Sequence, residues 1–266
     1  MARVIVVTSG KGGVGKTTIV ANLGMHLAKK NYRVCLVDMD VGLNNLDVVM
    51  NMEERVCYTM LDIIENRCRL KEALIQDDCY PLLFLLSSGS LNQNLTIRTS
   101  QIKEIISEAN NLFDFVLIDC PAGIDAGFKR AIMCADEALV VTTPHLSSLR
   151  DADKVVTILS SYGIDNKRFI INRARGDLIQ DKLMFDAYDI GKTLDIDFGG
   201  VIPEDDNVII NTSENITNNK IELNRAFDIL AENIITGSKK LFDCTYKYRG
   251  VLGKIKKLIK RSMWWI

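Results

Sequence analysis

Residues 9–18 of the chain are Ser9-Gly10-Lys11-Gly12-Gly13-Val14-Gly15-Lys16-Thr17-Thr18. This stretch lies between an apolar run at 4–7 and a helical pattern over 17–30, and from Gly10 its spacing is G-x-x-x-x-G-K-T. Glycines let successive backbone N–H groups turn inward around a phosphate, and the following helix adds its positive N-terminal end. The stretch therefore predicts a strand, a phosphate-binding loop and a helix in succession.

Two side chains of this loop carry the expected chemistry. We expect Lys16 to reach the β- and γ-phosphates of a nucleotide and the Thr17 hydroxyl to ligate Mg²⁺. A glycine-rich turn without a ligand is the alternative, and the complete spacing in its strand and helix context argues against it. The predicted nucleotide contacts in the loop are Gly10, Lys11, Gly12, Gly13, Val14, Gly15, Lys16, Thr17 and Thr18.

Length and composition favour one large domain. The 266 residues are 47% hydrophobic and 25% charged, which suits a single buried core. Seven cysteines without a C-x-x-C pair indicate reduced thiols that are mostly small buried hydrophobes. We expect no secretory or transit peptide, because the first strand pattern already begins at residue 3. No apolar run approaches the roughly 18 residues of a membrane-spanning helix.

Short apolar runs alternate with helical patterns along most of the chain. Strand-like runs lie at 4–7, 34–37, 82–86, 115–118, 138–142, 169–171 and 199–202, and helical patterns include 101–112, 147–162 and 181–194. Such alternation is typical of a mostly parallel sheet covered on both faces, which binds ligands at the carboxyl ends of its strands. The expected fold class is therefore α/β, a single domain with a mostly parallel sheet and helices on both faces, followed by a C-terminal amphipathic helix.

A second lysine, Lys11, lies inside the loop, where an ordinary phosphate-binding loop does not need one. The string from Lys11 to Thr18 resembles the deviant Walker A motif of the ParA–MinD ATPase family, which includes the plasmid-partition ATPases and the nitrogenase iron protein. In that family the extra lysine contacts the nucleotide of the partner subunit. The resemblance implies a P-loop NTPase fold, a homodimer with ATP at its interface, and catalytic roles for Lys11 and Lys16. A solvated loop lysine is the alternative for Lys11.

Two carboxylates follow the strand-like run at 34–37. The stretch from Asp38 to Asp47 is similar to the first switch segment of this ATPase family. By that resemblance Asp40 is a catalytic residue that positions the attacking water, and Asp38 lies near the Mg²⁺. Carboxylates suit both tasks, because a water needs an acceptor and Mg²⁺ prefers hard oxygen ligands. Carboxylates that only stabilise a strand-end turn are the alternative for both.

Another apolar strand, at 115–118, ends in Asp119, which is the Walker B pattern. We expect Asp119 to hold the Mg²⁺ shell, usually through water. The following stretch from Cys120 to Gly123 resembles the second switch of the family, in which the backbone N–H of Gly123 contacts the γ-phosphate. The predicted metal residues are therefore Thr17, Asp38 and Asp119.

Later strand ends carry the expected contacts to the base. Asn172 and Arg173 close the run at 169–171, and in the family an asparagine here binds the adenine edge, which suits its paired donor and acceptor. By resemblance the segment after 199–202 also approaches the base, and its predicted contacts are Pro203, Glu204 and Asp205. Residues 147–154 begin a helix that the family uses for partner binding, and an ordinary solvated helix start is the alternative.

The charge of the chain is uneven at its carboxyl end. Residues 244–266 contain seven Lys or Arg and no Asp or Glu, although the whole chain has a formal net charge of −1. On a helical wheel the apolar residues of 250–266, except Trp264, lie on one face and the basic residues on the other. This pattern predicts a helix in a membrane interface, and the alternatives are a helix docked on the domain's own core and a nucleic-acid-binding tail. The predicted membrane contacts are Val251, Leu252, Lys254, Ile255, Lys256, Lys257, Leu258, Ile259, Lys260, Arg261, Met263, Trp264, Trp265 and Ile266.

These features divide the chain into an ATPase domain at 1–243 and a membrane-targeting tail at 244–266. They predict a switch that binds ATP and Mg²⁺, dimerises across its nucleotides and binds the inner face of an anionic bacterial or plastid membrane peripherally. By resemblance it places the division septum with a division inhibitor and a topological-specificity factor, and no nucleic-acid partner is expected. The alternatives are a DNA-partition ATPase, a nitrogenase-type iron–sulfur protein and a non-hydrolysing membrane scaffold.

Overall fold

The computed structural model describes residues 1–41, 45–89, 97–204, 221–250, 253 and 257. In this part of the chain one sheet has the strand order β3-β4-β2-β5-β1-β6-β7-β8, and all neighbouring pairs are parallel except β3 with β4. The strands are β1 (Arg3–Thr8), β2 (Val34–Asp38), β3 (Ile75–Gln76), β4 (Leu83–Leu86), β5 (Phe115–Asp119), β6 (Glu137–Thr142), β7 (Asn166–Ala174) and β8 (Asp197–Pro203). The predicted mostly parallel sheet is confirmed.

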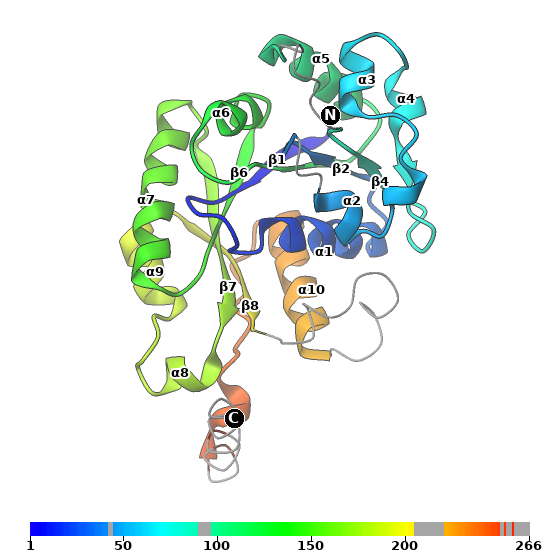
Figure 1. Ribbon diagram of the computed structural model, residues 1–266. Coiled ribbons are helices and arrows are strands. Elements are labelled where there is room, and N and C mark those ends of the chain that lie inside the picture. The colour runs from blue at the N-terminus through cyan, green and yellow to red at the C-terminus, as the bar shows by residue number, and fades with distance from the viewer. Residues whose placement is uncertain (42–44, 90–96, 205–220, 251–252, 254–256, 258–266) are drawn as a thin grey trace.

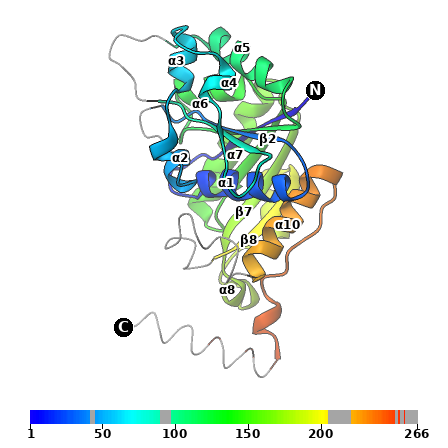
Figure 2. The same ribbon diagram turned by 90° about the vertical axis from the view of Figure 1, so that its right-hand side faces the viewer.

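Helices cover both faces of this sheet (Figures 1 and 2). The described helices are α1 (Lys16–Lys29), α2 (Asn45–Val49), α3 (Met60–Ile64), α4 (Leu70–Ala73), α5 (Thr99–Asn110), α6 (Ala126–Ile132), α7 (Leu146–Ser161), α8 (Gly176–Gln180), α9 (Ala187–Leu194) and α10 (Ile221–Thr236), with 3₁₀ turns η1 (Glu53–Arg55) and η3 (Tyr246–Tyr248). Helices α1 and α10 pack together on one face, and α5, α6, α7 and α9 cover the other. Right-handed crossovers explain the division, because α1 leads toward one edge of the sheet while α6 and α7 lead toward the opposite edge.

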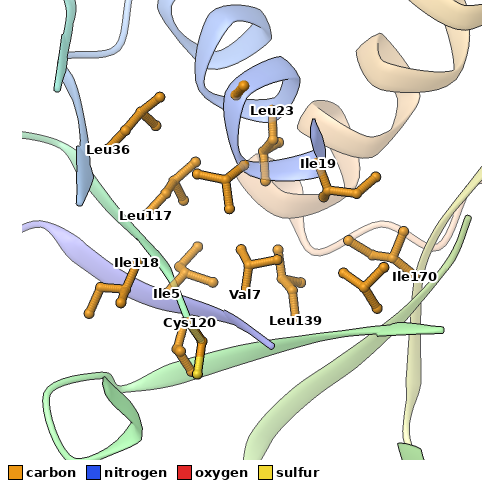
Figure 3. Close-up of a cluster of buried hydrophobic side chains, with 14 of the residues drawn as sticks. Ile5, Val7, Ile19, Leu23, Leu36, Leu117, Ile118, Cys120, Leu139 and Ile170 are labelled. Carbon is orange, nitrogen blue, oxygen red and sulfur yellow. The ribbon is translucent and has the colours of Figure 1, made fainter. Parts of the chain in front are cut away.

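The core lies between these layers and the central strands. Figure 3 shows Ile19 and Leu23 of α1 over Val7, Leu117 and Leu139, which come from three neighbouring strands. All of them are buried, as expected for strands that read as continuous apolar runs and are covered on both faces. The packing of α1 on this surface fixes the position of the loop that precedes the helix.

One local prediction differs from the structure, and two elements were not predicted. The helix expected over 181–194 begins only at Ala187, because the Asp186 carboxylate accepts hydrogen bonds from the backbone N–H groups of Tyr188 and Asp189 and so forms the helix N-cap. Lys182, inside the expected helix, has a left-handed backbone with φ of 59°, which a right-handed helix excludes. The short antiparallel strand β3 and the helix α10 were not predicted either.

The segment that follows α10, as far as Tyr248, lies against the body of the domain. Phe242, Cys244 and Tyr248 are buried, and η3 packs on α8. Most of the predicted membrane contacts lie outside the described residues, and among them only Lys257 has a described position. No helix in the described ranges is long and apolar enough to cross a bilayer.

Candidate nucleotide site

The glycine-rich loop lies between β1 and α1 at the centre of the sheet. Strand β1 has β5 on one side and β6 on the other, so the loop opens at the point where the strand order reverses. Gly13 and Gly15 have left-handed backbones with φ of 74° and 94°, and Gly15 is the N-cap of α1. These conformations turn the loop back toward the start of the helix, where a phosphate is favoured.

Two segments that are distant in the sequence pack closely against the outside of the loop. A Cβ at Gly10 would lie 2.2 Å from the backbone oxygen of Asp151 in α7, and a Cβ at Gly15 would lie 2.3 Å from Nδ2 of Asn172. The Asn172 Nδ2 donates a hydrogen bond of 2.8 Å to the Val14 carbonyl oxygen. Gly10 is therefore required by packing, and Gly15 by both packing and backbone conformation.

A pair of glycine variants separates these two requirements. Gly13→Ala and Gly15→Ala both place a side chain on a left-handed backbone, but a Cβ at Gly13 meets nothing within 4 Å. We expect Gly15→Ala to lower the free energy of unfolding by about 1–3 kcal/mol more than Gly13→Ala, because it also displaces Asn172. Urea unfolding of both variants measures the difference, and equal losses would contradict a tight contact. Adding Asn172→Ala to Gly15→Ala should recover part of the loss.

Lys16 is held under the loop with its amine turned inward. Lys16 is only 8% exposed, and its Nζ donates a hydrogen bond to the Ser9 hydroxyl at 3.1 Å. The Ser9 hydroxyl donates in turn to the Lys11 carbonyl oxygen at 2.7 Å. Among the described residues the buried ammonium donates only to this hydroxyl, so it is well placed to meet a phosphate, which would compensate its charge. Lys11, by contrast, is exposed.

Two carboxylates come together where β2 and β5 end. Asp38 and Asp119 are paired in register, and both are buried. The Asp38 carboxylate accepts hydrogen bonds from the backbone N–H of Asp40 at 2.8 Å and of Leu46 at 3.2 Å. Burial nevertheless raises the pKa of Asp38 to about 6.

Hydrogen bonds compensate the burial of the Asp119 carboxylate less completely than that of Asp38. Burial raises the pKa of Asp119 to about 7, against the opposing effect of a hydrogen bond with the Thr17 side chain and the attraction of Lys16. Its Oδ1 is buried without a hydrogen-bond partner in the described structure. A buried carboxylate oxygen without a donor is an energetic liability in the free protein and becomes favourable when a cation approaches.

These residues fit a magnesium–nucleotide complex. Asp119 supplies a free hard oxygen, Thr17 lies beside it, and Asp38 adds a second carboxylate. The described residues contain no group of three His, Cys, Asp or Glu side chains suited to a metal. A metal at this site would therefore take its remaining ligands from the Thr17 hydroxyl, from phosphate oxygens and from water, which is how proteins usually hold Mg²⁺ with nucleotides.

An open cleft of about 440 Å³ extends from the outer side of the loop. Its walls are formed by Lys11, Gly12, Gly13, Val14, Thr143, His145, Ser147, Ser148, Arg173, Arg175, Leu178, Met184 and Glu204. The structure thus brings the predicted base contacts Arg173 and Glu204 next to Lys11. Arg173 sits at a β-bulge with φ of 56°, a conformation that turns a residue out of the regular alternation of its strand.

Other predicted residues do not line this cleft or lie outside the described structure. Asn172 does not line the cleft, since its amide donates to Val14 and its Oδ1 accepts from the backbone N–H of Arg173 at 2.9 Å. Pro203 is buried at the end of β8. Gly123 has a left-handed backbone with φ of 89° after β5, and Asp205 lies outside the described residues.

Arg175 is a cleft residue that sequence reasoning missed. Its guanidinium donates to the buried carboxylate of Asp177 through Nε at 3.0 Å and Nη2 at 2.8 Å, and its Nη1 lies 3.6 Å from the Glu204 carboxylate. The signal in the sequence was an Arg-x-Asp spacing directly after β7. An Arg-x-Asp pair in a surface turn has the same spacing, so only the fold distinguishes a cleft residue from a turn residue.

Two cysteines follow β5, and both are free thiols. Burial raises the pKa of the Cys120 thiol to about 12 and that of Cys134 to about 11. Both thiols are therefore neutral near pH 7 in the free protein.

Several known proteins are similar to this chain over most of its length. The AAA domain family matches residues 2–168. A putative septum site-determining protein MinD from Chlorella vulgaris is 44% identical over 96% of this chain and 92% of the relative. The MinC:MinD cell division protein complex of Aquifex aeolicus contains a chain that is 36% identical, with a TM-score of 0.83 over 90% of this chain and 98% of that one.

A further solved structure carries a ligand. The septum site-determining protein MinD of Pyrococcus horikoshii, complexed with Mg-ADP, has a TM-score of 0.78 and 29% identity over 89% of this chain and 97% of that one. Both the identity and the extent of these matches exceed what a shared fold alone produces. The chain therefore belongs to the MinD family of septum site-determining ATPases.

Proposed function

We propose that this ATPase is a dimeric, nucleotide-operated membrane switch that helps to place the division septum. The observation that carries the proposal is the arrangement at the strand ends: Lys16 is buried beneath the loop, and Asp119 has an unpaired oxygen beside it. Such a pair destabilises the free protein, and it becomes favourable when a magnesium–phosphate group binds between the two side chains. ATP and Mg²⁺ are the ligands that we assign to this site.

The chemical step is the transfer of the γ-phosphoryl group to water. Thr17 and Asp119 would hold Mg²⁺ at this site, and the ion would supply positive charge that offsets the charge of the phosphate oxygens. Lys16 stabilises the charge that develops on the phosphoryl oxygens, and Thr17 and Asp119 hold the metal shell. Asp40 orients the attacking water, and its backbone is anchored because its N–H donates to the Asp38 carboxylate. Exposed Lys11 extends to the nucleotide of the second subunit, so the site is complete only in the dimer.

Partners follow from the same proposal. The Aquifex aeolicus relative forms a complex named MinC:MinD, which supports a division inhibitor as a partner of this chain. A topological-specificity factor that stimulates hydrolysis completes the proposed cycle. The 244–266 tail binds an anionic membrane surface, because its basic residues and apolar face match a headgroup region. A dimer presents two such tails and therefore binds much more tightly than a monomer.

Sedimentation with anionic liposomes tests the membrane switch. The intact chain and a chain ending at Tyr248 are compared in ATP and in ADP, each with Mg²⁺. Tyr248 is buried, so this truncation keeps the packed residues of the domain. We expect pelleting of the intact chain in ATP, a reduction of at least about tenfold in ADP because only the dimer presents two tails, and none for the truncated chain.

Two outcomes would overturn the proposal. Equal pelleting in ATP and ADP would separate the tail from the nucleotide cycle. Absence of pelleting, together with salt-sensitive binding of the truncated chain to duplex DNA, would favour a partition ATPase instead. Light scattering or sedimentation velocity of the intact chain without lipid reports dimerisation independently of the membrane.

A further inference from the structure

Helix α8 is packed against the segment that leads into the tail. A Cβ at Gly176 would lie 2.0 Å from the backbone oxygen of Cys244, so the two segments approach as closely as a missing side chain allows. Tyr248, four residues further on, is 5% exposed. Figure 1 shows the segment after α10 beside α8 at one end of the molecule. The root of the tail is therefore fixed to this helix.

The same helix makes a second contact further along the tail. Lys257 Nζ lies 2.6 Å from Oδ1 of Asp181, the residue that follows α8 as its C-cap. The Lys257 side chain is only 13% exposed, and that of Asp181 is 32% exposed. This is unexpected for Lys257, because the helical wheel places it among the basic residues that meet the membrane. A lysine held in an ion pair with its own domain is not available to a lipid headgroup.

The opposite end of α8 is connected to the nucleotide cleft. Arg175 lines the cleft and holds the fully buried Asp177 of α8 through two hydrogen bonds. Arg175 also faces Glu204, another cleft residue, across 3.6 Å. The N-cap of this short helix, Arg175, thus lines the cleft, and its C-cap, Asp181, contacts the tail, with the five residues of α8 between them.

We propose that the Asp181–Lys257 ion pair is an autoinhibitory latch that holds the tail against α8 and must open before the tail binds a membrane. The inference rests on the proposed membrane function of the tail. Asp181 and an anionic lipid compete for the same ammonium group, so the latch weakens membrane binding of the free protein. Because α8 also holds Arg175, a ligand in the cleft acts on the element that carries the latch.

The tail has a built-in reporter for this test. The chain contains two tryptophans, Trp264 and Trp265, and both follow Lys257 in the tail. Tryptophan anisotropy and acrylamide quenching of the full chain therefore report the tail alone. Without lipid, Asp181→Asn is expected to lower the anisotropy and raise the quenching constant, and Asp165→Asn, an exposed change of equal charge, to leave both unchanged.

Reversal of the pair separates the latch from other effects at Asp181. Asp181→Lys and Lys257→Asp should each release the tail, and the double variant should restore the anisotropy of the original chain. No restoration in the double variant would show that the ion pair does not hold the tail. This measurement involves no membrane, so it stands apart from the success or failure of the proposed membrane binding.

Membrane binding gives the second readout. At subsaturating anionic liposomes in ADP, Asp181→Asn is expected to increase the pelleted fraction of the full chain about two- to fivefold, the range for breaking one partly exposed ion pair. Unchanged tail mobility with normal pelleting of the original chain would overturn the latch and leave the membrane proposal intact. A released tail without any pelleting would overturn autoinhibition together with the membrane proposal.

Discussion

Lys16→Ala is expected to lower kcat for ATP hydrolysis by about 10²- to 10³-fold, the usual cost of removing one preorganised group that stabilises the transition state. Lys16 is buried within the loop. In the described structure its Nζ donates a hydrogen bond only to the Ser9 hydroxyl. It is therefore aimed at the space where phosphate oxygens would lie. Steady-state phosphate release at saturating ATP and Mg²⁺ measures the effect.

Two other lysine variants make this result specific. Lys103→Ala removes an exposed lysine of α5 and should leave hydrolysis unchanged. Lys11→Ala should preserve nucleotide binding by the single chain but lose dimer-dependent hydrolysis, because Lys11 is exposed at the rim of the cleft. A Lys16→Ala variant that folds and hydrolyses ATP within about threefold of the original rate would contradict the assignment of this site, since a lost transition-state contact costs far more.

Asp119→Asn is expected to abolish Mg²⁺-dependent hydrolysis while stabilising the free protein. The original carboxylate is buried, has an unpartnered oxygen, and its pKa is raised by burial to about 7. An asparagine keeps the shape without the charge. Above pH 7 the free energy of unfolding should therefore rise by about 4 kcal/mol, as expected when a shift from 3.8 to about 7 is removed.

The sign of this effect changes with pH in a defined way. A carboxyl whose pKa is higher in the folded state holds its proton more firmly when folded, so it stabilises the fold fully below pH 3.8. That contribution is lost as pH rises to about 7. Asp38, whose pKa in the folded state is about 6, also contributes less to the free energy of unfolding as the pH rises. Urea unfolding from pH 5 to 8 should show a falling stability that Asp119→Asn flattens, whereas the exposed Asp153→Asn does not.

A magnesium–nucleotide complex should reverse the trend in the original protein. A cation bound to Asp119 favours the ionised carboxylate, and any ligand that binds only the folded state adds stability. Asp119→Asn should gain less from the complex than the original chain. Equal gains in both proteins would show that Asp119 does not contact the metal shell.

The sequence was sufficient to predict the chemistry that lies within short stretches. The strand, loop and helix around Lys16 follow from local glycine spacing and apolar runs. Asp38 and Asp119 each follow an apolar run, and parallel pairing then places them side by side. The structure confirms this convergence of strand ends, because the order of the sheet places β1, β5 and β2 next to one another.

Contacts between distant segments could not be predicted in this way. The Asn172 amide contacts Val14 across 158 positions, and Arg175 lines the cleft directly after β7, whose pairing with β8 shifts in register after Ile171. Helical periodicity gives α9 too long a range, since it does not detect the cap at Asp186. A helical wheel places Lys257 on a free basic face, whereas the fold gives it an acidic partner.

The contact between Asn172 and Val14 also affects how nucleotide enters and leaves. It ties the loop to β7 without any help from a ligand, so the phosphate cradle is preorganised before binding. Little of the binding free energy is then consumed in ordering the backbone, and association can proceed without a slow folding step. Differences in affinity between ATP and ADP would consequently arise mainly from their dissociation rates, and these rates set how long each nucleotide stays bound.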